Sequence, residues 1–360
     1  MKNIEYNWLE NDWLRLQALR ARLPHALLIH GNPDIGKRAL ATLFAQSLLC
    51  QTPAQSGHPC GECHACRWFD EDNHPDFRAL LPESLQTGDA VAEGEEGAEG
   101  GAAGSTAGGT AGATKTAKSK TPSREIKIEQ VRALDSFFNI GTHRGGARVI
   151  LVYPADALNI PSSNALLKTL EEPAAGTVFL LVTSHPDQVL PTIRSRASKF
   201  TVAAPDAAQC LAWLSAQGVA DAAARLAEAG GAPLAALNAA RLDEFSAERS
   251  ELLDALSAGR FDPLITAERC EKAGNERVAL WLMRWVADLI LVAGGNGVPR
   301  FHPSRQDALR IGAARMNARA LHRYQRQLVA ARRTAGHPLN ARLFAEELLI
   351  DYGRLLHDAR

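Results

Sequence analysis

The stretch at 148–196 constrains the fold of this chain more strongly than any other part of the sequence. Continuous apolar runs at 149–153 and 177–183 predict two strands that are buried on both faces. Between them, residues 165–172 have the pattern of a helix that is capped by a serine at 162–163 and ended by a proline. Strand, helix and strand, followed by a loop that carries arginines, are typical of the second half of a nucleotide-binding α/β domain with a parallel sheet.

A phosphate loop is predicted near the N-terminus. An apolar strand pattern at 26–30 is followed by Gly-Asn-Pro-Asp-Ile-Gly-Lys-Arg and then by a helical pattern. In this context the backbone N–H groups around Gly31 and Gly36 form an anion cradle, and Lys37 reaches the β- and γ-phosphates of a nucleotide. The motif requires Ser or Thr at its last position to hold Mg²⁺, but Arg38 has no lone pair for a metal. We therefore expect a degenerate loop without a Mg²⁺ site, for which ATP binding stays an open question; the alternative is an ordinary glycine-rich turn.

Four cysteines that lie close together in the sequence predict a metal site. They follow the pattern C-x9-C-x2-C-x2-C and are Cys50, Cys60, Cys63 and Cys66. Four thiolates suit one closed tetrahedral Zn²⁺ site, which is structural because no coordination position stays open. Each thiol must lose its proton to bind zinc, so metal binding and folding of this segment should be coupled. His64 could replace one sulfur, and the alternative is a set of free buried cysteines, as we expect for Cys210 and Cys270.

The composition narrows the classes of function. The chain has 40 basic and 40 acidic residues, so its net charge is zero and no overall field attracts nucleic acid. If the protein works on DNA, most of the phosphate contacts should therefore come from partner proteins. No apolar run is long enough to span a bilayer, and the N-terminus lacks the apolar core of a signal peptide. We therefore expect a cytoplasmic protein without membrane contacts.

The composition also divides the chain into three expected domains. These are an α/β domain at 1–204 with a zinc module at 50–66, a small helical lid at 205–245 and an all-α domain at 246–360. Residues 84–123 are almost entirely small or polar, which predicts a disordered insertion. The helices of the last domain are expected to line their apolar faces with Trp281, Trp285, Leu289, Leu343, Leu348 and Leu349.

The helix pattern in the central stretch carries a family resemblance. Residues 163–173 are Ser-Asn-Ala-Leu-Leu-Lys-Thr-Leu-Glu-Glu-Pro, and Ser195-Arg196 follows the next predicted strand. This sequence closely resembles the clamp-loader ATPases of bacterial DNA polymerase III, which belong to the AAA+ superfamily. The resemblance implies an AAA+ P-loop domain with a zinc module, a helical lid and a helical collar. It also implies a hetero-pentamer with gamma or tau ATPases and the delta subunit, which acts on the sliding clamp and primed DNA in replication.

Three elements depart from the hydrolysing members of the resembled family. Arg38 replaces the residue that holds Mg²⁺. Those members have an Asp-Glu pair where this chain has Tyr153 and Pro154, neither of which can ligate Mg²⁺ or polarise water. They also have an arginine that senses the γ-phosphate, and Leu234 stands in its place. Asp156 lies two residues beyond the acidic pair's position, and we assign it no such role.

One element is intact in this chain. Ser195 and Arg196 match the motif from which these subunits project an arginine finger into a neighbour's site, although the cysteine that often follows is replaced by Ala197. A guanidinium supplied in trans stabilises the charge on a transferring phosphoryl group, so that hydrolysis depends on assembly. The resemblance thus implies a catalytic contribution of Arg196 in trans; the alternative is a solvated loop arginine.

Together these features favour a subunit that is not an active ATPase by itself and that donates Arg196 to a neighbouring ATPase. One alternative is an ATP-hydrolysing motor subunit of the gamma or tau type, which would need Ser or Thr at 38 and Asp-Glu at 153–154. Another is a zinc module that binds nucleic acid, which would need a basic surface with aromatic side chains around the cysteines. Residues 50–77 offer only Arg67 as a full cation, which argues against that alternative.

Overall fold

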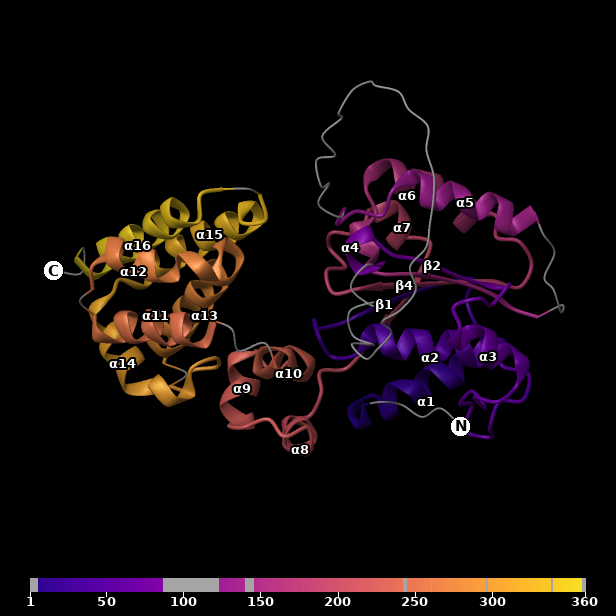
Figure 1. Cartoon of the computed structure of the whole chain (residues 1–360), viewed down its shortest axis with the longest axis horizontal. Coiled ribbons are helices and arrows are strands. Elements are labelled where there is room, and N and C mark those ends of the chain that lie inside the picture. Colours follow the sequence, from indigo (N-terminus) through magenta and orange to yellow (C-terminus); the bar gives the residue numbers. More distant parts are fainter. Residues whose placement is uncertain are drawn as a thin grey trace, which may run out of the picture. The chain divides into compact units, whose positions relative to one another are not determined.

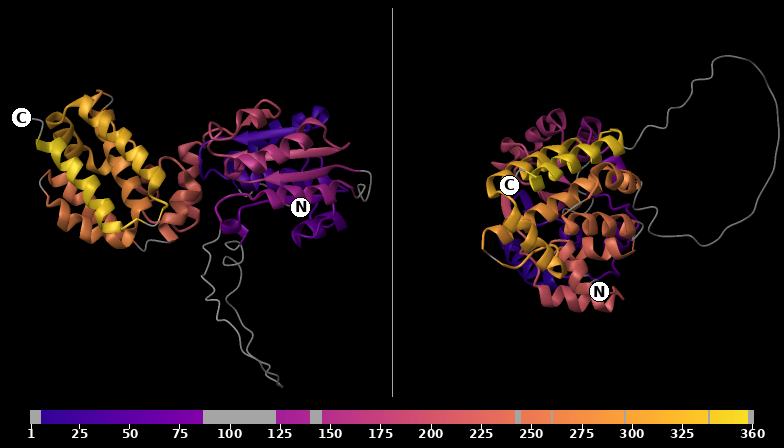
Figure 2. Two further views of the ribbon diagram at one scale, coloured as in Figure 1. Left: turned by 90° about the horizontal axis from the view of Figure 1, so that it is seen from above. Right: turned by 90° about the vertical axis from the view of Figure 1, so that its left-hand side faces the viewer.

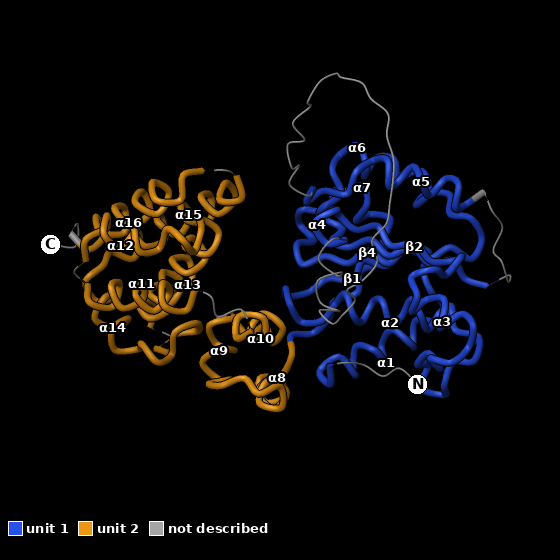
Figure 3. The backbone as a smooth tube through the Cα atoms, in the orientation of Figure 1, with its two compact units in different colours: residues 1–204 blue, residues 205–360 orange. Residues whose placement is uncertain are grey.

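The computed structural model describes residues 6–86, 123–139, 146–241, 245–259, 261–295, 297–337 and 339–357. The chain forms two compact units, residues 1–204 and residues 205–360 (Figure 3). Most of the insertion expected at 84–123 lies outside the described residues, and its first three residues belong to a short helix. The division of the second unit at 245 into a lid and a collar stays a prediction.

The first unit is built on a five-stranded sheet with the strand order β2-β3-β4-β1-β5, in which every pair is parallel. The strands are β1 (Ala26–His30), β2 (Phe77–Leu80), β3 (Arg148–Val152), β4 (Thr177–Thr183) and β5 (Ser198–Thr201). Every residue of β3 and β4 is buried, which confirms the predicted parallel α/β core. Because the strands run in one direction, their carboxyl ends meet at one edge of the sheet, where folds of this class bind ligands.

Helices cover both faces of this sheet. Helices α1, α2 and α3 lie on one face, and α5, α6 and α7 lie on the other (Figure 1). The helices are α1 (Glu10–Leu19), α2 (Lys37–Leu49), α3 (His64–Asp70), α4 (Glu83–Gln86), α5 (Ile128–Asn139), α6 (Ile160–Glu171) and α7 (Pro191–Arg194), with 3₁₀ turns at Asn7–Leu9, Arg20–Arg22 and Ala155–Ala157.

Helix α6 begins earlier than the sequence pattern predicts, and the serine cap expected at 162–163 is wrong. The cap is Asn159, whose side-chain oxygen accepts a hydrogen bond from the backbone N–H of Ser162 at 3.0 Å. Pro161 fits the first turn because no intrahelical donor is needed there. The Ser162 hydroxyl is buried and donates to the carbonyl of Ile126 at 2.6 Å, so this serine fixes α6 against the segment before α5.

All regular elements among the described residues of the second unit are helices, drawn from salmon through orange to yellow in Figure 2. Its helices are α8 (Ala207–Ala216), α9 (Ala222–Glu228), α10 (Pro233–Arg241), α11 (Ser246–Ala258), α12 (Pro263–Cys270), α13 (Asn275–Ala293), α14 (Gln306–Arg315), α15 (Ala318–Thr334) and α16 (Ala341–His357), with 3₁₀ turns at Glu271–Ala273 and Pro303–Arg305. Across the described parts of both units, none of the helices combines the length and the apolar character needed to cross a membrane.

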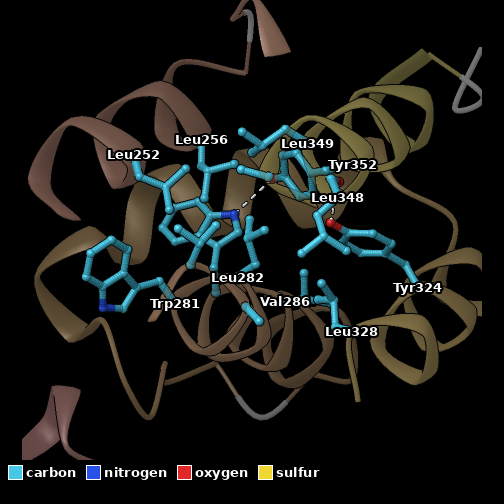
Figure 4. Packing of buried hydrophobic residues seen from close by; sticks show 14 of the residues in the cluster. Leu252, Leu256, Trp281, Leu282, Val286, Tyr324, Leu328, Leu348, Leu349 and Tyr352 are labelled. Carbon is cyan, nitrogen blue, oxygen red and sulfur yellow. Dashed lines mark hydrogen bonds between the residues drawn. The ribbon is translucent and has the colours of Figure 1, made fainter. Parts of the chain in front are cut away.

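The core of the second unit is formed mainly by α11, α13, α15 and α16 (Figure 4). The Trp285 indole N–H donates to the Tyr352 hydroxyl at 2.9 Å, and the Tyr324 hydroxyl donates to the carbonyl of Leu348 at 2.7 Å. Five of the six side chains expected on buried faces are indeed buried. The prediction for Leu343 is wrong, because its side chain lies in the first turn of α16 and is 62% exposed.

A buried carboxylate fixes the segment that follows α13. Asp288 has no exposed surface and accepts hydrogen bonds from the backbone N–H groups of Arg300, Phe301 and His302, the shortest at 2.7 Å. The His302 ring nitrogen Nδ1 lies 2.9 Å from the same carboxylate. A single buried side chain thus satisfies three successive backbone donors, of which that of His302 is itself buried.

We expect Asp288→Ala to lower the free energy of unfolding of the second unit by about 3 kcal/mol, because buried donors then lose a charged acceptor. Urea unfolding followed by tryptophan fluorescence and circular dichroism measures this change. Asp254→Ala is the matched control, because that carboxylate is 65% exposed and its partners, Arg305 and the Ser250 hydroxyl, bind it at the surface. Equal effects of the two substitutions would contradict the assigned role of Asp288.

Candidate functional site

The loop between β1 and α2 requires glycine at the two positions that the predicted phosphate loop contains. A Cβ atom at Gly31 would lie 2.8 Å from the carbonyl oxygen of Val202, so the backbone passes too close for any other residue. Gly36 precedes α2 with a φ of 92°, a left-handed conformation that favours glycine. A Cβ atom there would lie 2.5 Å from the ring of Tyr6. The loop is also held from outside, because the Trp8 indole N–H donates to the carbonyl of Ile35 at 2.9 Å.

Lys37 is buried beneath this loop rather than extended into solvent. Only 4% of it is exposed, and its ammonium group donates to the carbonyl of Asn32 and, at 3.0 Å, to the Ser184 hydroxyl. Burial lowers the pKa of Lys37 to about 8, while the nearby carboxylates Asp34 and Asp156 act in the opposite direction. The lysine therefore remains mostly protonated at neutral pH, and its charge is satisfied within the chain.

The lowered pKa predicts how Lys37 affects stability as the pH changes. The folded chain loses this proton near pH 8, whereas the unfolded chain keeps it until about pH 10.4. The contribution of Lys37 to the free energy of unfolding therefore becomes more favourable as the pH rises between these values. The difference in unfolding free energy between wild type and Lys37→Met should therefore grow in favour of wild type from pH 8 to pH 10. Lys168→Met is the control, because it removes an exposed lysine, and the trend of Lys37→Met is read relative to it. The same trend in both variants would rule out the assigned titration of Lys37.

Two residues that depart from the ATPase motifs contact each other. The Arg38 guanidinium carbon lies 5.6 Å from the centre of the Tyr153 ring, in a cation–π arrangement. Burial raises the pKa of the Tyr153 hydroxyl, as does the charge of Asp34, while Arg38 lowers it. The two positions that would bind Mg²⁺ directly and through water thus carry a cation and a neutral phenol ring, and neither is a ligand for a hard metal ion.

Two residues at the same edge of the sheet were not found by reading the sequence. Asp156 accepts a hydrogen bond from the Thr183 hydroxyl at the end of β4, and Ser184, the next residue, is a partner of Lys37. Sequence reasoning assigned no role to Asp156 and did not consider Ser184. The available indication was their position, because Ser184 directly follows β4, Asp156 lies in the 3₁₀ turn after β3, and the carboxyl ends of parallel strands line one edge.

The four clustered cysteines converge on one point. The sulfur atoms of Cys50, Cys60, Cys63 and Cys66 all lie within 4.8 Å of one another. Individual Sγ–Sγ distances are 3.6 Å for Cys50–Cys60, 3.9 Å for Cys60–Cys66 and 4.0 Å for Cys50–Cys63. Four sulfurs bound to Zn²⁺ at about 2.3 Å are about 3.8 Å apart in a regular tetrahedron. The donor set and its dimensions therefore fit a metal ion of the size and softness of zinc, and His64 is not part of the group.

Local structure explains why these sulfurs meet. Cys50 follows the end of α2, and Cys63 caps α3, where its sulfur accepts a hydrogen bond from the N–H of Cys66 at 3.4 Å. The Thr52 hydroxyl and the backbone N–H groups of Glu62 and Cys63 lower the pKa of Cys60 to about 6. Such donors favour the thiolate form that a metal needs. Outside the cluster, Cys210 and Cys270 are buried, as expected.

Ser195 and Arg196 directly follow α7, before β5. Ser195 donates its hydroxyl to the carbonyl of Thr192 at 3.0 Å. Arg196 is partly exposed, forms an ion pair with Glu171 at the end of α6, and donates to the same Thr192 carbonyl at 2.9 Å. The guanidinium is thus available at the surface but is held by an acidic partner. Leu234, at the start of α10, belongs to the second unit.

Comparisons with known proteins assign the family. A family model described as "DNA polymerase III, delta subunit" matches residues 11–206, and one described as "DNA polymerase III, delta subunit, C terminal" matches residues 243–353. DNA polymerase III subunit delta′ of Escherichia coli K12 is 31% identical over 310 residues, which cover 84% of this chain and 78% of the relative. The chain belongs to the delta′ family of DNA polymerase III subunits. This assignment confirms the resemblance seen in the sequence.

Two further relatives, one delta′ subunit and one tau subunit, show which type of subunit the chain resembles more. DNA polymerase III subunit delta′ of Pseudomonas aeruginosa is 37% identical over 236 residues, and the match spans 64% of this chain but only 60% of the relative's length. Subunit tau of Escherichia coli K12 is 30% identical over 188 residues, which cover 52% of this chain and 23% of that protein. The delta′ family therefore fits the chain better than the motor alternative does.

Proposed function

We propose that this chain is the delta′-type subunit of a DNA polymerase III clamp loader. In this role it assembles with gamma or tau ATPases and a delta subunit into a hetero-pentamer in the cytoplasm. The complex places the sliding clamp on primed DNA during replication, and this chain does not hydrolyse ATP itself. The observation that carries the proposal is the contact of Arg38 with Tyr153, because both positions needed for Mg²⁺ are occupied by side chains that cannot bind it.

The catalytic contribution that we propose lies in Arg196. Its position directly after α7 and its partial exposure allow the guanidinium to reach an adjoining subunit once the ion pair with Glu171 opens. Arginine suits this role because its planar donors match phosphate oxygens. Exchange of the Glu171 carboxylate for a γ-phosphate would keep the guanidinium paired in both states. Ser195 serves as a positioning residue, because its hydroxyl is anchored to Thr192 beside the arginine.

We further propose that the cysteine cluster holds one structural Zn²⁺ ion. All four coordination positions are supplied by Cys50, Cys60, Cys63 and Cys66, so no position is open for water or substrate. The bound ion would tie the end of α2 to the start of α3, two elements joined by 14 residues that contain no other helix or strand. The loop 50–63 would then be ordered by the metal rather than by a core of its own.

The contact of Arg38 with Tyr153 also argues against an ATP-hydrolysing motor subunit, and this alternative can be tested directly. We expect the purified chain to show no ATP turnover above background, with or without primed DNA. Mixed with ATPase and delta subunits, it should co-elute with them in size-exclusion chromatography and restore clamp loading to a mixture that lacks it. ATP turnover by the chain alone that disappears in Lys37→Met would contradict the proposal and favour a motor subunit. Failure to co-elute would contradict the proposed assembly.

A further inference from the structure

The positive charge of the second unit is concentrated around one helix. Between Asp307 and Glu346 the sequence contains no acidic residue and no lysine. It contains eight arginines in that interval: Arg310, Arg315, Arg319, Arg323, Arg326, Arg332, Arg333 and Arg342. Five of them lie on α15 (Ala318–Thr334). The zero net charge of the chain therefore conceals a strongly basic segment.

The packing of α15 determines where its arginines point. Leu321, Tyr324 and Leu328 are buried, with at most 1% of each exposed. Figure 4 shows Tyr324 and Leu328 turned into the core of the unit. An α-helix turns by about 100° per residue, so positions 319, 323, 326 and 333 fall within about 40° of one line on the opposite side. Arg319, Arg323, Arg326 and Arg333 are all exposed, and we call them the α15 arginine face.

The charge of the α15 arginine face is not neutralised by the part of the chain that the structure describes. None of its four arginines forms an ion pair with another described residue. Other arginines of the unit do have such partners, for example Arg305 with Asp254 at 2.7 Å and Arg354 with Asp351 at 2.8 Å. A row of like charges on one helix destabilises that helix slightly. Binding of an anionic partner from outside the chain would offset this repulsion.

The chemistry of the face fits a phosphate backbone better than a protein surface. Protein interfaces contain a core of apolar and aromatic side chains, whereas the exposed residues of α15 include one large apolar side chain, Val329, which is 39% exposed. From Arg319 to Arg333 the helix rises by about 21 Å, which corresponds to about six base pairs of duplex DNA. Arginine forks bind phosphate oxygens in a bidentate manner without reading base sequence.

We propose that the α15 arginine face binds the phosphate backbone of double-stranded DNA. This goes beyond the proposed function, in which DNA is reached only through the assembled complex. The contact is independent of sequence and depends strongly on salt, because it releases counterions from the duplex. It gives a chain of zero net charge a local attachment to DNA in its helical second unit.

The test measures binding of the isolated full-length chain to a fluorescein-labelled 30-base-pair duplex by fluorescence anisotropy, at several salt concentrations from 50 to 200 mM. We expect wild type to bind, and the triple variant Arg319→Gln, Arg323→Gln, Arg326→Gln to bind at least tenfold more weakly at 50 mM salt. The slope of log K against log salt concentration should become flatter by about 2.7, or about 0.9 for each phosphate that an arginine no longer neutralises.

A second triple variant tests whether the position of the arginines matters or only the total charge of the chain. The substitutions Arg269→Gln, Arg342→Gln and Arg354→Gln remove the same charge from positions that already have acidic partners. This control should lose less than threefold in affinity, and both variants should keep the wild-type melting temperature because the substituted residues lie at the surface.

Absence of DNA binding by wild type, or equal losses in the two triple variants, would overturn the proposal. So would a triple α15 variant that binds DNA normally but no longer assembles with ATPase and delta subunits, because the face would then contact an acidic protein partner. Each of these results is independent of whether the chain hydrolyses ATP, so the proposed function is tested separately.

Discussion

Arg196→Ala should slow ATP hydrolysis at the neighbouring subunit's site by about 10³-fold in the assembled loader, whereas assembly itself should be unchanged. An arginine that stabilises the charge of the transferring phosphoryl group contributes a factor of about 10³ to 10⁵ in phosphoryl transfer. The guanidinium pairs with the exposed carboxylate of Glu171, so its loss costs the fold of this chain little. Single-turnover hydrolysis in the presence of primed DNA measures the effect at the site concerned.

The control for this prediction lies two residues away. Arg194 ends α7 and donates to the carbonyl of Pro186 at 3.2 Å, so its side chain is used within the chain. Arg194→Ala should therefore leave hydrolysis within about twofold of wild type. Glu171→Gln should also preserve hydrolysis, because it only releases Arg196 from its ion pair. Equal losses for Arg194→Ala and Arg196→Ala would indicate that the loop, and not one guanidinium, matters.

Removing the metal should have the largest effect on stability. We expect one zinc ion per chain, and we expect its extraction by a chelator to lower the free energy of unfolding of the first unit by about 5 kcal/mol or more. Without the ion, the loop at 50–63 loses the metal–sulfur bonds that hold it. Cys66, which is completely buried, and Cys50, which is almost so, then keep their protons, because burial raises the pKa of both thiols. Thermal unfolding with and without chelator, together with the zinc content determined by colorimetry, measures both quantities.

Substitutions distinguish the cluster from an ordinary buried cysteine. Cys66→Ser should abolish stoichiometric zinc and reproduce the stability of the metal-depleted chain. Cys210→Ser removes an equally buried sulfur from the second unit and should keep the zinc content of wild type. A wild-type chain that contains no zinc, or one that a chelator leaves fully stable, would contradict the assignment.

The sequence predicts those features of the fold that depend on neighbouring residues. The strand at 177–183 is found at β4 with the predicted bounds, because a continuous apolar run of this length needs burial on both faces. The cysteine spacing likewise predicts the convergence of four sulfurs, because the four residues lie within 17 positions of the chain.

Features that depend on tertiary proximity were missed. Nothing in the sequence around Ser184 indicates that it contacts Lys37, since the two residues are 147 positions apart. Likewise, no sequence pattern predicts the ion pair between Arg196 and Glu171. The cap of α6 was misplaced because Ser162, a favourable cap residue, is used instead for a buried hydrogen bond to Ile126.

We propose that this chain acts on ATP only through a neighbour's site. The most direct measurement compares DNA-stimulated ATP turnover by loaders reconstituted with wild type, Arg196→Ala and Lys37→Met. We expect a large loss for Arg196→Ala and turnover within about twofold of wild type for Lys37→Met, because neither Arg38 nor Tyr153 beside this loop offers a ligand for Mg²⁺. The opposite pattern, with turnover lost in Lys37→Met and kept in Arg196→Ala, would contradict it.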